Sequence, residues 1–247
     1  EFATLIELAY REDAPTGDLS TRYILSESDR AIATLIAKDD GIVSGLEVAY
    51  MVLCRCTPEE EITFTSEYED GDEVRKGDIL ATIEAPYAEL LRAERIMLNF
   101  LQRMSGIATY THQCVQCVSG TKTQILDTRK TAPGHRLTDK MAVRDGGGTN
   151  HRASLSDMVM LKDNHIAMAG GILPAVEEVR PNLPISVLIE VETTTLEEVQ
   201  EALDAGADII MLDNMDIETM RRAVVLINGQ AKVEASGNMT AERLAAV

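Results

Sequence analysis

The sequence predicts an α/β protein whose second half consists of repeated strand–helix units around a parallel sheet. Two observations predict this class. After residue 120, short apolar stretches typical of buried strands alternate with amphipathic helical patterns. Each stretch also ends in charged or hydrogen-bonding residues, as in α/β barrels, where the C-terminal ends of the strands form the active site. The 247 residues, 45% of them hydrophobic, allow one large domain or two small ones.

The first 85 residues mix short alternating stretches with turns. We expect a strand at residues 33–37, a strand leading into a helix at 41–56, and two short strands around glycine turns at 70–83. The last stretch resembles the small β-sandwich of biotinyl and lipoyl carriers. Those carriers present a modifiable lysine in a tight hairpin, whereas Lys76 lies in a plain charged turn, so a carrier function is the weaker hypothesis.

Residues 87–118 carry the longest helical pattern, with apolar residues at three- and four-residue spacing. Ser105 and Gly106 are predicted to interrupt this pattern, which gives two helices. Cys114 and Cys117 lie on the same pattern, and no second cluster of cysteine and histidine completes a tetrahedral zinc site. We therefore expect reduced thiols, as in a cytoplasmic protein.

Beyond residue 120 the pattern of strand, loop and helix repeats. Five strands are predicted, each followed by polar residues, at 123–126, 158–161, 186–189, 208–212 and 231–233. Helices are predicted at 172–179, 196–203 and 217–227. Five units do not close an eight-stranded barrel, so either strands from elsewhere complete it or a last unit follows Val247.

The charge of the chain excludes some classes of partner. The net charge is −18, whereas nucleic-acid-binding proteins are usually basic, and no apolar run is long enough to span a membrane. We therefore expect neither nucleic acid nor membrane as partner. Residues 122–162 nevertheless hold eight Lys or Arg against four Asp, a net charge of +4 that leaves −22 for the rest. This basic segment indicates a focused anion site.

The basic segment contains the residue types that bind anions. Arg129 and Arg152 suit a bidentate grip on carboxylates or phosphates, and Lys130 and Lys162 add point charges. The glycine triplet at 146–148 is predicted to let the backbone approach a ligand and to offer it amide donors.

Carboxylates follow the basic segment. Strand alternation places Glu190 and Glu192 on one face of the sheet, and Asp213 ends the next strand. Carboxylates beside a polyphosphate usually hold Mg²⁺ through their oxygens. Cations for anionic groups, together with carboxylates for a metal or a sugar, fit a phosphoribosyl donor.

In this order the motifs resemble the quinolinate phosphoribosyltransferase family. The resemblance runs along essentially the whole chain, through AER at 93–95, LNFLQ at 98–102, SGIAT at 105–109, DTRKTAPG at 127–134, AVR at 142–144, GGG at 146–148, NHR at 150–152, LKDNH at 161–165, EVE at 190–192, LDN at 212–214 and EASG at 234–237. It implies an N-terminal α/β sandwich domain followed by an incomplete, TIM-like parallel α/β barrel. The first domain, with a dimer-forming helix, would cover residues 1–98 and the catalytic barrel residues 99–247. The family continues with a further strand and a glycine-containing phosphate loop.

The resemblance also implies roles for individual residues. Quinolinate would be bound by Arg129, His151, Arg152 and Lys162, and by Arg95 from the neighbouring subunit of a homodimer or an assembly of dimers with shared active sites. Phosphoribosyl pyrophosphate and its Mg²⁺ would be held by Lys130, Glu192, Asp213, Ser236 and Gly237, and Thr128 is also expected to bind substrate. The metal ligands would be Glu192 and Asp213, and the catalytic residues Lys162, Glu192 and Asp213. We expect Asp163, Asn164 and His165 to support these residues.

The expected reaction forms no covalent enzyme intermediate. The pyridine nitrogen of quinolinate attacks C1 of the ribose with inversion while pyrophosphate leaves with Mg²⁺. Glu192 or Asp213 stabilises the developing oxocarbenium ion, and Lys162 stabilises the carbanion that forms when CO₂ departs. Protonation then gives nicotinate mononucleotide, which leads to NAD.

Other functions also fit parts of the sequence. The nearest alternative is a transferase of the same fold for another pyridine acid, or a related protein of molybdenum uptake. The two arginines, histidine and lysine fit a dicarboxylate better than the single carboxylate of nicotinate. A barrel that binds phosphate ligands without catalysis would fit a chain that ends at Val247. A carrier would be modified at Lys76.

Overall fold

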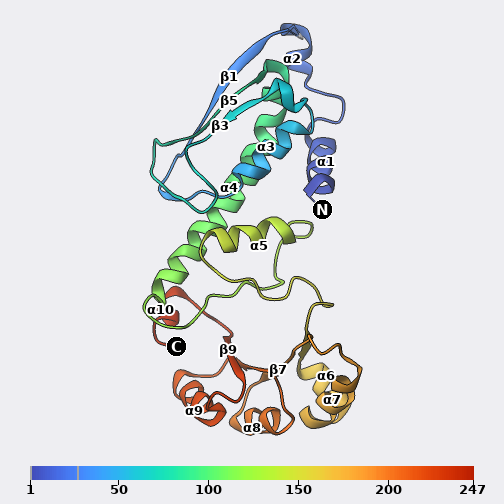
Figure 1. The fold of residues 1–247 in the computed structure, drawn as a ribbon, viewed down its shortest axis with the longest axis vertical. Helices are drawn as coiled ribbons and strands as arrows, with labels where there is room; N and C mark the ends of the chain where they lie inside the picture. The colour runs from blue at the N-terminus through green and yellow to red at the C-terminus, as the bar shows by residue number, and fades with distance from the viewer. Residues whose placement is uncertain (1, 27) are drawn as a thin grey trace. The chain divides into compact units, whose positions relative to one another are not determined.

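The computed structural model describes residues 2–26 and 28–247, and the chain divides into two compact units, residues 1–151 and 152–247 (Figure 1). The elements of the first unit are α1 (Phe2–Asp13), α2 (Leu19–Ile24), β1 (Arg30–Ile36), β2 (Gly41–Ile42), α3 (Leu46–Cys54), the 3₁₀ helix η1 (Glu59–Glu61), β3 (Thr63–Thr65), β4 (Glu73–Val74), β5 (Ile79–Pro86), α4 (Tyr87–Cys117) and α5 (Arg136–Asp145). The strands expected within 33–37, 41–56 and 70–83 are confirmed, as is the helix that follows β2.

The first unit contains an antiparallel sheet with one covered face. Its strand order is β1-β5-β3, and β2 pairs with β4 in a second, two-stranded sheet. Along β5 the side chains of Ala81, Ile83 and Ala85 are buried, whereas Thr82 and Glu84 are exposed. The buried face shares one apolar core with helices α3 and α4. This arrangement is the predicted N-terminal α/β sandwich.

The prediction of two helices around Ser105 and Gly106 is wrong, because α4 runs unbroken from Tyr87 to Cys117. A glycine inside a helix costs about 1 kcal/mol relative to alanine. Contacts along the helix offset this cost: the Ser105 hydroxyl donates to the Ser44 carbonyl (3.1 Å) and accepts from the Ser44 amide (3.0 Å). The helix also crosses residue 98, so the division into domains at that residue stays a prediction.

The second unit is a parallel sheet with helices on one face (Figure 1). Its elements are β6 (Val159–Leu161), α6 (Asp163–Ala169), α7 (Ile172–Val179), the 3₁₀ helix η2 (Arg180–Asn182), β7 (Ile189–Thr193), α8 (Leu196–Asp204), β8 (Ile209–Asp213), α9 (Ile217–Ile227), β9 (Lys232–Ser236) and α10 (Ala241–Leu244), and the strand order is β6-β7-β8-β9. Apolar side chains from one sheet face pack with α7, α8 and α9. Helices on a single face favour part of an α/β barrel over a doubly wound sheet, which confirms the predicted fold class.

Three strand predictions need correction. Residues 123–126 form no strand: Thr123 and Gln124 are exposed, and an isolated parallel bridge joins Leu126 to Thr149. The strand expected at 186–189 is β7, which begins at Ile189 and so contains Glu190 and Glu192. Likewise β9 continues through Glu234. The prediction ended each strand before its first glutamate, but Glu190, Glu192 and Glu234 lie within β7 and β9.

The hydropathy of the helices and the state of the cysteines can also be compared with the sequence analysis. No helix in the described part of the chain is long and apolar enough to cross a membrane. All four cysteines are free thiols, as the spacing analysis predicted.

Candidate active site

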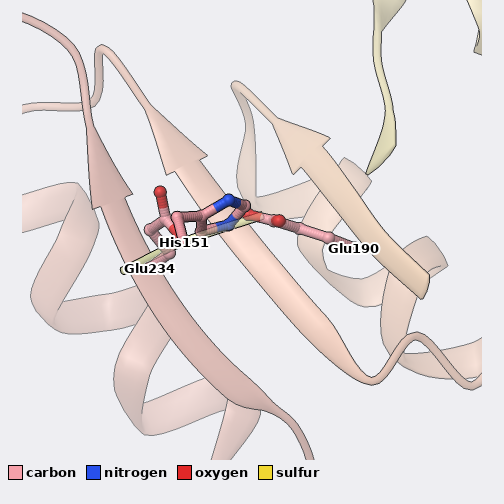
Figure 2. A group of neighbouring side chains, drawn as sticks. All are labelled: His151, Glu190 and Glu234. Carbon is pink, nitrogen blue, oxygen red and sulfur yellow. The ribbon is translucent and has the colours of Figure 1, made fainter. Parts of the chain in front are cut away.

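The second unit presents a polar sheet face opposite its helices. The strand register aligns Glu192 of β7 with Met211 of β8 and Glu234 of β9. Because side chains alternate, Glu190 and Asp213 share this face. Figure 2 shows Glu190 and Glu234 on their strands, and one carboxylate oxygen of each lies within 4.8 Å of the other. Glu190 is fully buried. The sequence placed Glu190 and Glu192 on one face correctly, but it did not identify Glu234 as part of this group.

The predicted residues Lys162 and Glu192 lie together at the C-terminal edge of this sheet. Lys162 Nζ is 2.7 Å from Glu192 Oε2, in an ion pair whose carboxylate is largely buried while the lysine stays partly exposed. The backbone amide of Lys162 donates to His165 Nδ1 (3.1 Å) at the start of α6. His165 therefore supports the lysine, as expected, and does not itself lie on the polar face of the sheet strands.

Asp213, Ser236 and Gly237 form a second part of this edge. The Asn214 amide side chain donates to Asp213 Oδ2 (2.7 Å), and Asn238 donates to Asn214 Oδ1 (3.1 Å). The Asn214 backbone amide donates to the Ser236 carbonyl (3.0 Å). Gly237 has φ +90°, and a Cβ there would overlap the Asn214 side chain. Gly237 is thus required by its contact with Asn214, whose supporting role the sequence analysis missed.

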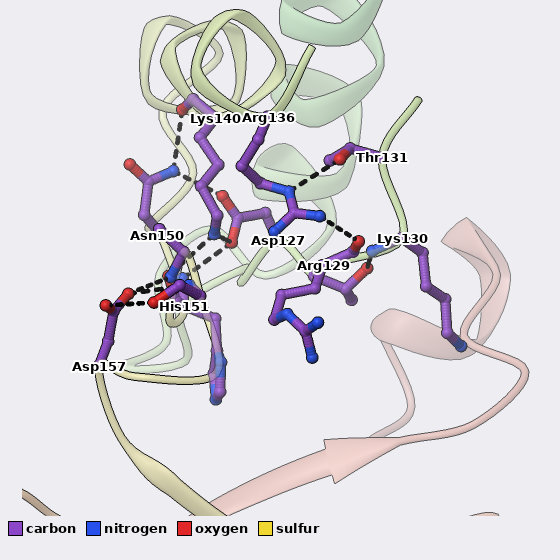
Figure 3. A network of polar contacts seen from close by, with 12 residues as sticks. Asp127, Arg129, Lys130, Thr131, Arg136, Lys140, Asn150, His151 and Asp157 are labelled. Atoms are coloured by element: carbon purple, nitrogen blue, oxygen red, sulfur yellow. Dashed lines mark hydrogen bonds and ion pairs between the residues drawn. The ribbon is translucent and has the colours of Figure 1, made fainter. Parts of the chain in front are cut away.

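The first unit brings the motif at 127–131 to that at 150–151 through a buried network (Figure 3). Asp127 accepts hydrogen bonds from the Lys140 ammonium, the Asn150 side chain (2.6 Å) and the His151 amide (2.8 Å). Lys140 also donates to the His151 carbonyl (2.8 Å). The side chains of Asp127 and Lys140 are each only 7% exposed. Neither has room to bind a ligand, so this pair fixes the loops that carry Arg129 and His151.

The loop at 128–131 is held by its own side chains and by α5. The Lys130 amide donates to Thr128 Oγ1 (3.0 Å). Arg136 donates to Thr131 Oγ1 (2.8 Å) and to the Arg129 carbonyl (2.9 Å). Arg129 Nε is buried and, within the described chain, has no hydrogen-bond partner. A buried guanidinium nitrogen without a partner is the kind of donor that an anionic ligand would satisfy.

The glycine triplet does not offer its amides to a ligand, so that prediction is wrong. The amides of Gly146, Gly147 and Gly148 donate to backbone carbonyls of α5, at 3.0, 2.8 and 2.9 Å. A Cβ at Gly146 would overlap the Ala108 carbonyl of α4, and a Cβ at Gly148 would lie 2.8 Å from Thr111 Cγ2. Glycine is needed because the turn packs directly against α4.

The two other predicted arginines are Arg95 in the first unit and Arg152 in the second. Arg95 is exposed on α4, and its side chain makes no hydrogen bond or ion pair with any described residue. Arg152 donates from Nη1 to the Met158 carbonyl (3.0 Å) and lies 3.4 Å from Met160 Sδ. The role predicted for Arg95 requires a second subunit and stays a prediction.

Comparisons with known proteins agree along the chain. A family model described as "Quinolinate phosphoribosyl transferase, N-terminal domain" matches residues 18–105, and one for the C-terminal domain matches residues 107–247. A probable nicotinate-nucleotide pyrophosphorylase (carboxylating) of Bacillus subtilis is 42% identical over 98% of this chain and 83% of its own length. A chloroplastic nicotinate-nucleotide pyrophosphorylase (carboxylating) of Arabidopsis thaliana is 43% identical, over 98% and 74%. The crystal structure of NadC from Streptococcus pyogenes is 40% identical, with a TM-score of 0.94 over 99% of this chain and 86% of that one.

Proposed function

Because this chain belongs to the quinolinate phosphoribosyltransferase family, we propose that it transfers phosphoribosyl from phosphoribosyl pyrophosphate to quinolinate with loss of CO₂. The products are nicotinate mononucleotide, pyrophosphate and CO₂, in NAD biosynthesis. The observation that carries this proposal is the match of both domain models, in chain order, over residues 18–105 and 107–247.

The dicarboxylate substrate explains the cations of the first unit. Quinolinate carries two carboxylates, and from the family resemblance we assign Arg129, His151, Arg152 and Lys162 to its binding. The buried, unpartnered Arg129 Nε supports this assignment, because a carboxylate would satisfy it. Thr128 and Lys130 follow on the same loop, and Lys130 is exposed and accessible to the donor's phosphates.

The carboxylates of the second unit suit the phosphoribosyl donor. We assign Glu192 and Asp213, with Ser236 and Gly237, to its ribose and pyrophosphate. Glu192 and Asp213 offer only carboxylate oxygens on one face of the sheet, and Mg²⁺ prefers oxygen ligands, so these residues fit that ion. When bound, Mg²⁺ neutralises the charge of departing pyrophosphate.

The residues of this chain can then act by electrostatics alone. A carboxylate of Glu192 or Asp213 stabilises positive charge at C1 of the ribose while the pyridine nitrogen attacks. Lys162 is held by Glu192 at 2.7 Å and remains partly exposed, so its ammonium can stabilise the carbanion that decarboxylation leaves on the ring. Neither step uses an enzyme nucleophile, so no sugar–enzyme adduct forms.

The assembly and the location of the protein belong to the same proposal. We propose a homodimer, alone or within an assembly of dimers, in which Arg95 of one subunit completes the quinolinate site of the other. The exposure of Arg95 on α4 and its lack of partners in the described chain support this arrangement. A cytoplasmic enzyme fits the free cysteines.

The test is a direct assay. The protein is incubated with quinolinate, phosphoribosyl pyrophosphate and Mg²⁺, and CO₂ release is followed together with nicotinate mononucleotide. Equal amounts of the two products are expected, and none without the phosphoribosyl donor. Glu192→Gln protein serves as the matched control, because it keeps the size of the side chain and removes its charge. Product from nicotinate instead of quinolinate, without CO₂, would contradict the assigned substrate.

A further inference from the structure

Two cations on helix α5 contact the chain's own loops. Arg136 and Lys140 are four residues apart, which places them on the same face of the helix. Both belong to the basic segment that indicated an anion site. Lys140 is 6% exposed and thus inaccessible to a ligand from solvent. A role other than direct anion binding must explain why a cation occupies the buried position of Lys140.

Lys140 fixes the backbone of His151 on both sides of its Cα. The Lys140 ammonium donates to the His151 carbonyl (2.8 Å) and to Asp127, and Asp127 in turn accepts from the His151 amide (2.8 Å). Asn150 closes the network by donating to Asp127 (2.6 Å) and to the Lys140 carbonyl (2.8 Å). With its amide and its carbonyl both held, the backbone of His151 is fixed, and with it the point from which the imidazole side chain extends.

Arg136 does the same for the neighbouring loop. Its guanidinium donates to the Arg129 carbonyl (2.9 Å) and to Thr131 Oγ1 (2.8 Å), so it joins the two residues that flank Lys130 (Figure 3). It holds the backbone of Arg129 and leaves the buried Nε of Arg129 for another acceptor. One face of α5 therefore anchors both ligand-binding loops of the first unit.

We propose that Lys140 and Arg136 are positioning residues for quinolinate: they hold His151 and Arg129 in their binding geometry without contacting the substrate. This inference rests on the proposed function. Its physical basis is that ionic hydrogen bonds inside a protein are strong and directional, whereas loops held only by backbone turns move more easily. An error of about 1 Å in the placement of a binding group can lower the rate about 100-fold.

The experiment compares single variants on one helix. Lys140→Met removes the buried charge, and Lys140→Gln, which keeps a donor, serves if the first variant is unstable. Arg136→Met tests the second loop. The matched control is Arg144→Met, because Arg144 is exposed on the same helix and its loss changes the net charge equally. For each protein, kcat and the KM of each substrate are measured well below the unfolding temperature, with quinolinate binding followed by calorimetry.

The positioning role predicts a selective effect on quinolinate. Its KM and Kd should rise about 10- to 100-fold in the Lys140 and Arg136 variants, by analogy with supporting residues at other sites, while the KM of the phosphoribosyl donor changes far less. Arg144→Met should match the wild type. Folded variants that lose thermal stability but keep the wild-type KM for quinolinate would refute the proposal. If the wild type itself makes no nicotinate mononucleotide yet binds quinolinate, the proposed reaction fails, and the binding data still decide the role of α5.

Discussion

The packing of Gly146 against α4 gives a prediction whose size follows from the structure. In Gly146→Ala, the new Cβ would overlap the Ala108 carbonyl and lie 2.7 Å from Thr111 Cβ, so the backbone of the turn must shift. Overpacking of this kind destabilises proteins by about 1–3 kcal/mol. For a chain of this size, each kcal/mol lowers the melting temperature by about 2–4 °C, so we expect a decrease of about 2–12 °C.

Calorimetric melting, with steady-state kinetics at room temperature, tests this reasoning. Gly106→Ala is the matched control, because Gly106 lies within α4 with no atom near its missing Cβ, and alanine there should raise helix stability by up to about 1 kcal/mol. The KM of the phosphoribosyl donor should not change in folded Gly146→Ala protein. An unchanged melting temperature with a raised KM would instead restore the prediction that the triplet offers its amides to a ligand.

Three further predictions follow from other contacts. Lys162→Met should lower kcat about 10²- to 10³-fold, as the loss of an electrostatic stabiliser does elsewhere, and an unchanged kcat in steady-state assays would remove Lys162 from the decarboxylation step. Arg95→Ala protein mixed with Arg129→Ala protein should regain part of the activity, since heterodimers contain one intact site; no recovery between freely exchanging subunits would refute shared sites. Burial raises the pKa of Asp70, whose carboxylate accepts a hydrogen bond from the Leu46 amide (2.8 Å) at the start of α3. Because the folded-state pKa exceeds the unfolded one, protonation of Asp70 stabilises the folded state at low pH, and this stability is lost as pH rises from about 4. In urea titrations at several pH values, the free energy of unfolding of Asp70→Asn protein should lack that loss. Parallel pH profiles of the wild type and the variant would contradict this reasoning.

Hydrophobic periodicity was enough to predict three helices of the second unit. The helices at Ile172–Val179 and Ile217–Ile227 coincide with their predicted bounds, because each has one strong apolar stripe and packs on one sheet face. Periodicity failed where tertiary contacts override local preference. Gly106 does not break α4, because hydrogen bonds from Ser105 and neighbouring residues hold that helix against β2 and the segment after it. Residues 123–126 look like a strand, yet the fold gives them only Thr149 as a partner.

The sequence predicted some residues of the candidate site and missed others that only tertiary contacts bring to it. Lys162 and Glu192 were both chosen from the ends of strands, and the structure joins them in an ion pair. Lys140 and Asn150 were not chosen, because lysine and asparagine side chains are usually exposed to solvent. Only the fold shows that Lys140 faces inward to Asp127, 13 residues away in sequence. The spacing of Arg136 and Lys140 on one helix face was the available signal.

The contrast between Lys140 and Lys162 explains why a local charge count locates an anion site without identifying its ligands. Both lysines lie in the basic segment, and both pair with a carboxylate, but burial separates their roles. The Lys140 side chain is 7% exposed and forms an ion pair with Asp127. Asp127 largely neutralises its charge, so Lys140 adds little to the positive electrostatic potential that a ligand would meet. The Lys162 side chain is 44% exposed beside Glu192, so it can exchange that partner for a substrate carboxylate or a developing negative charge. The net charge of +4 already cancels Lys140 against Asp127, so the anion-binding capacity of the segment depends on which of its other cations remain accessible.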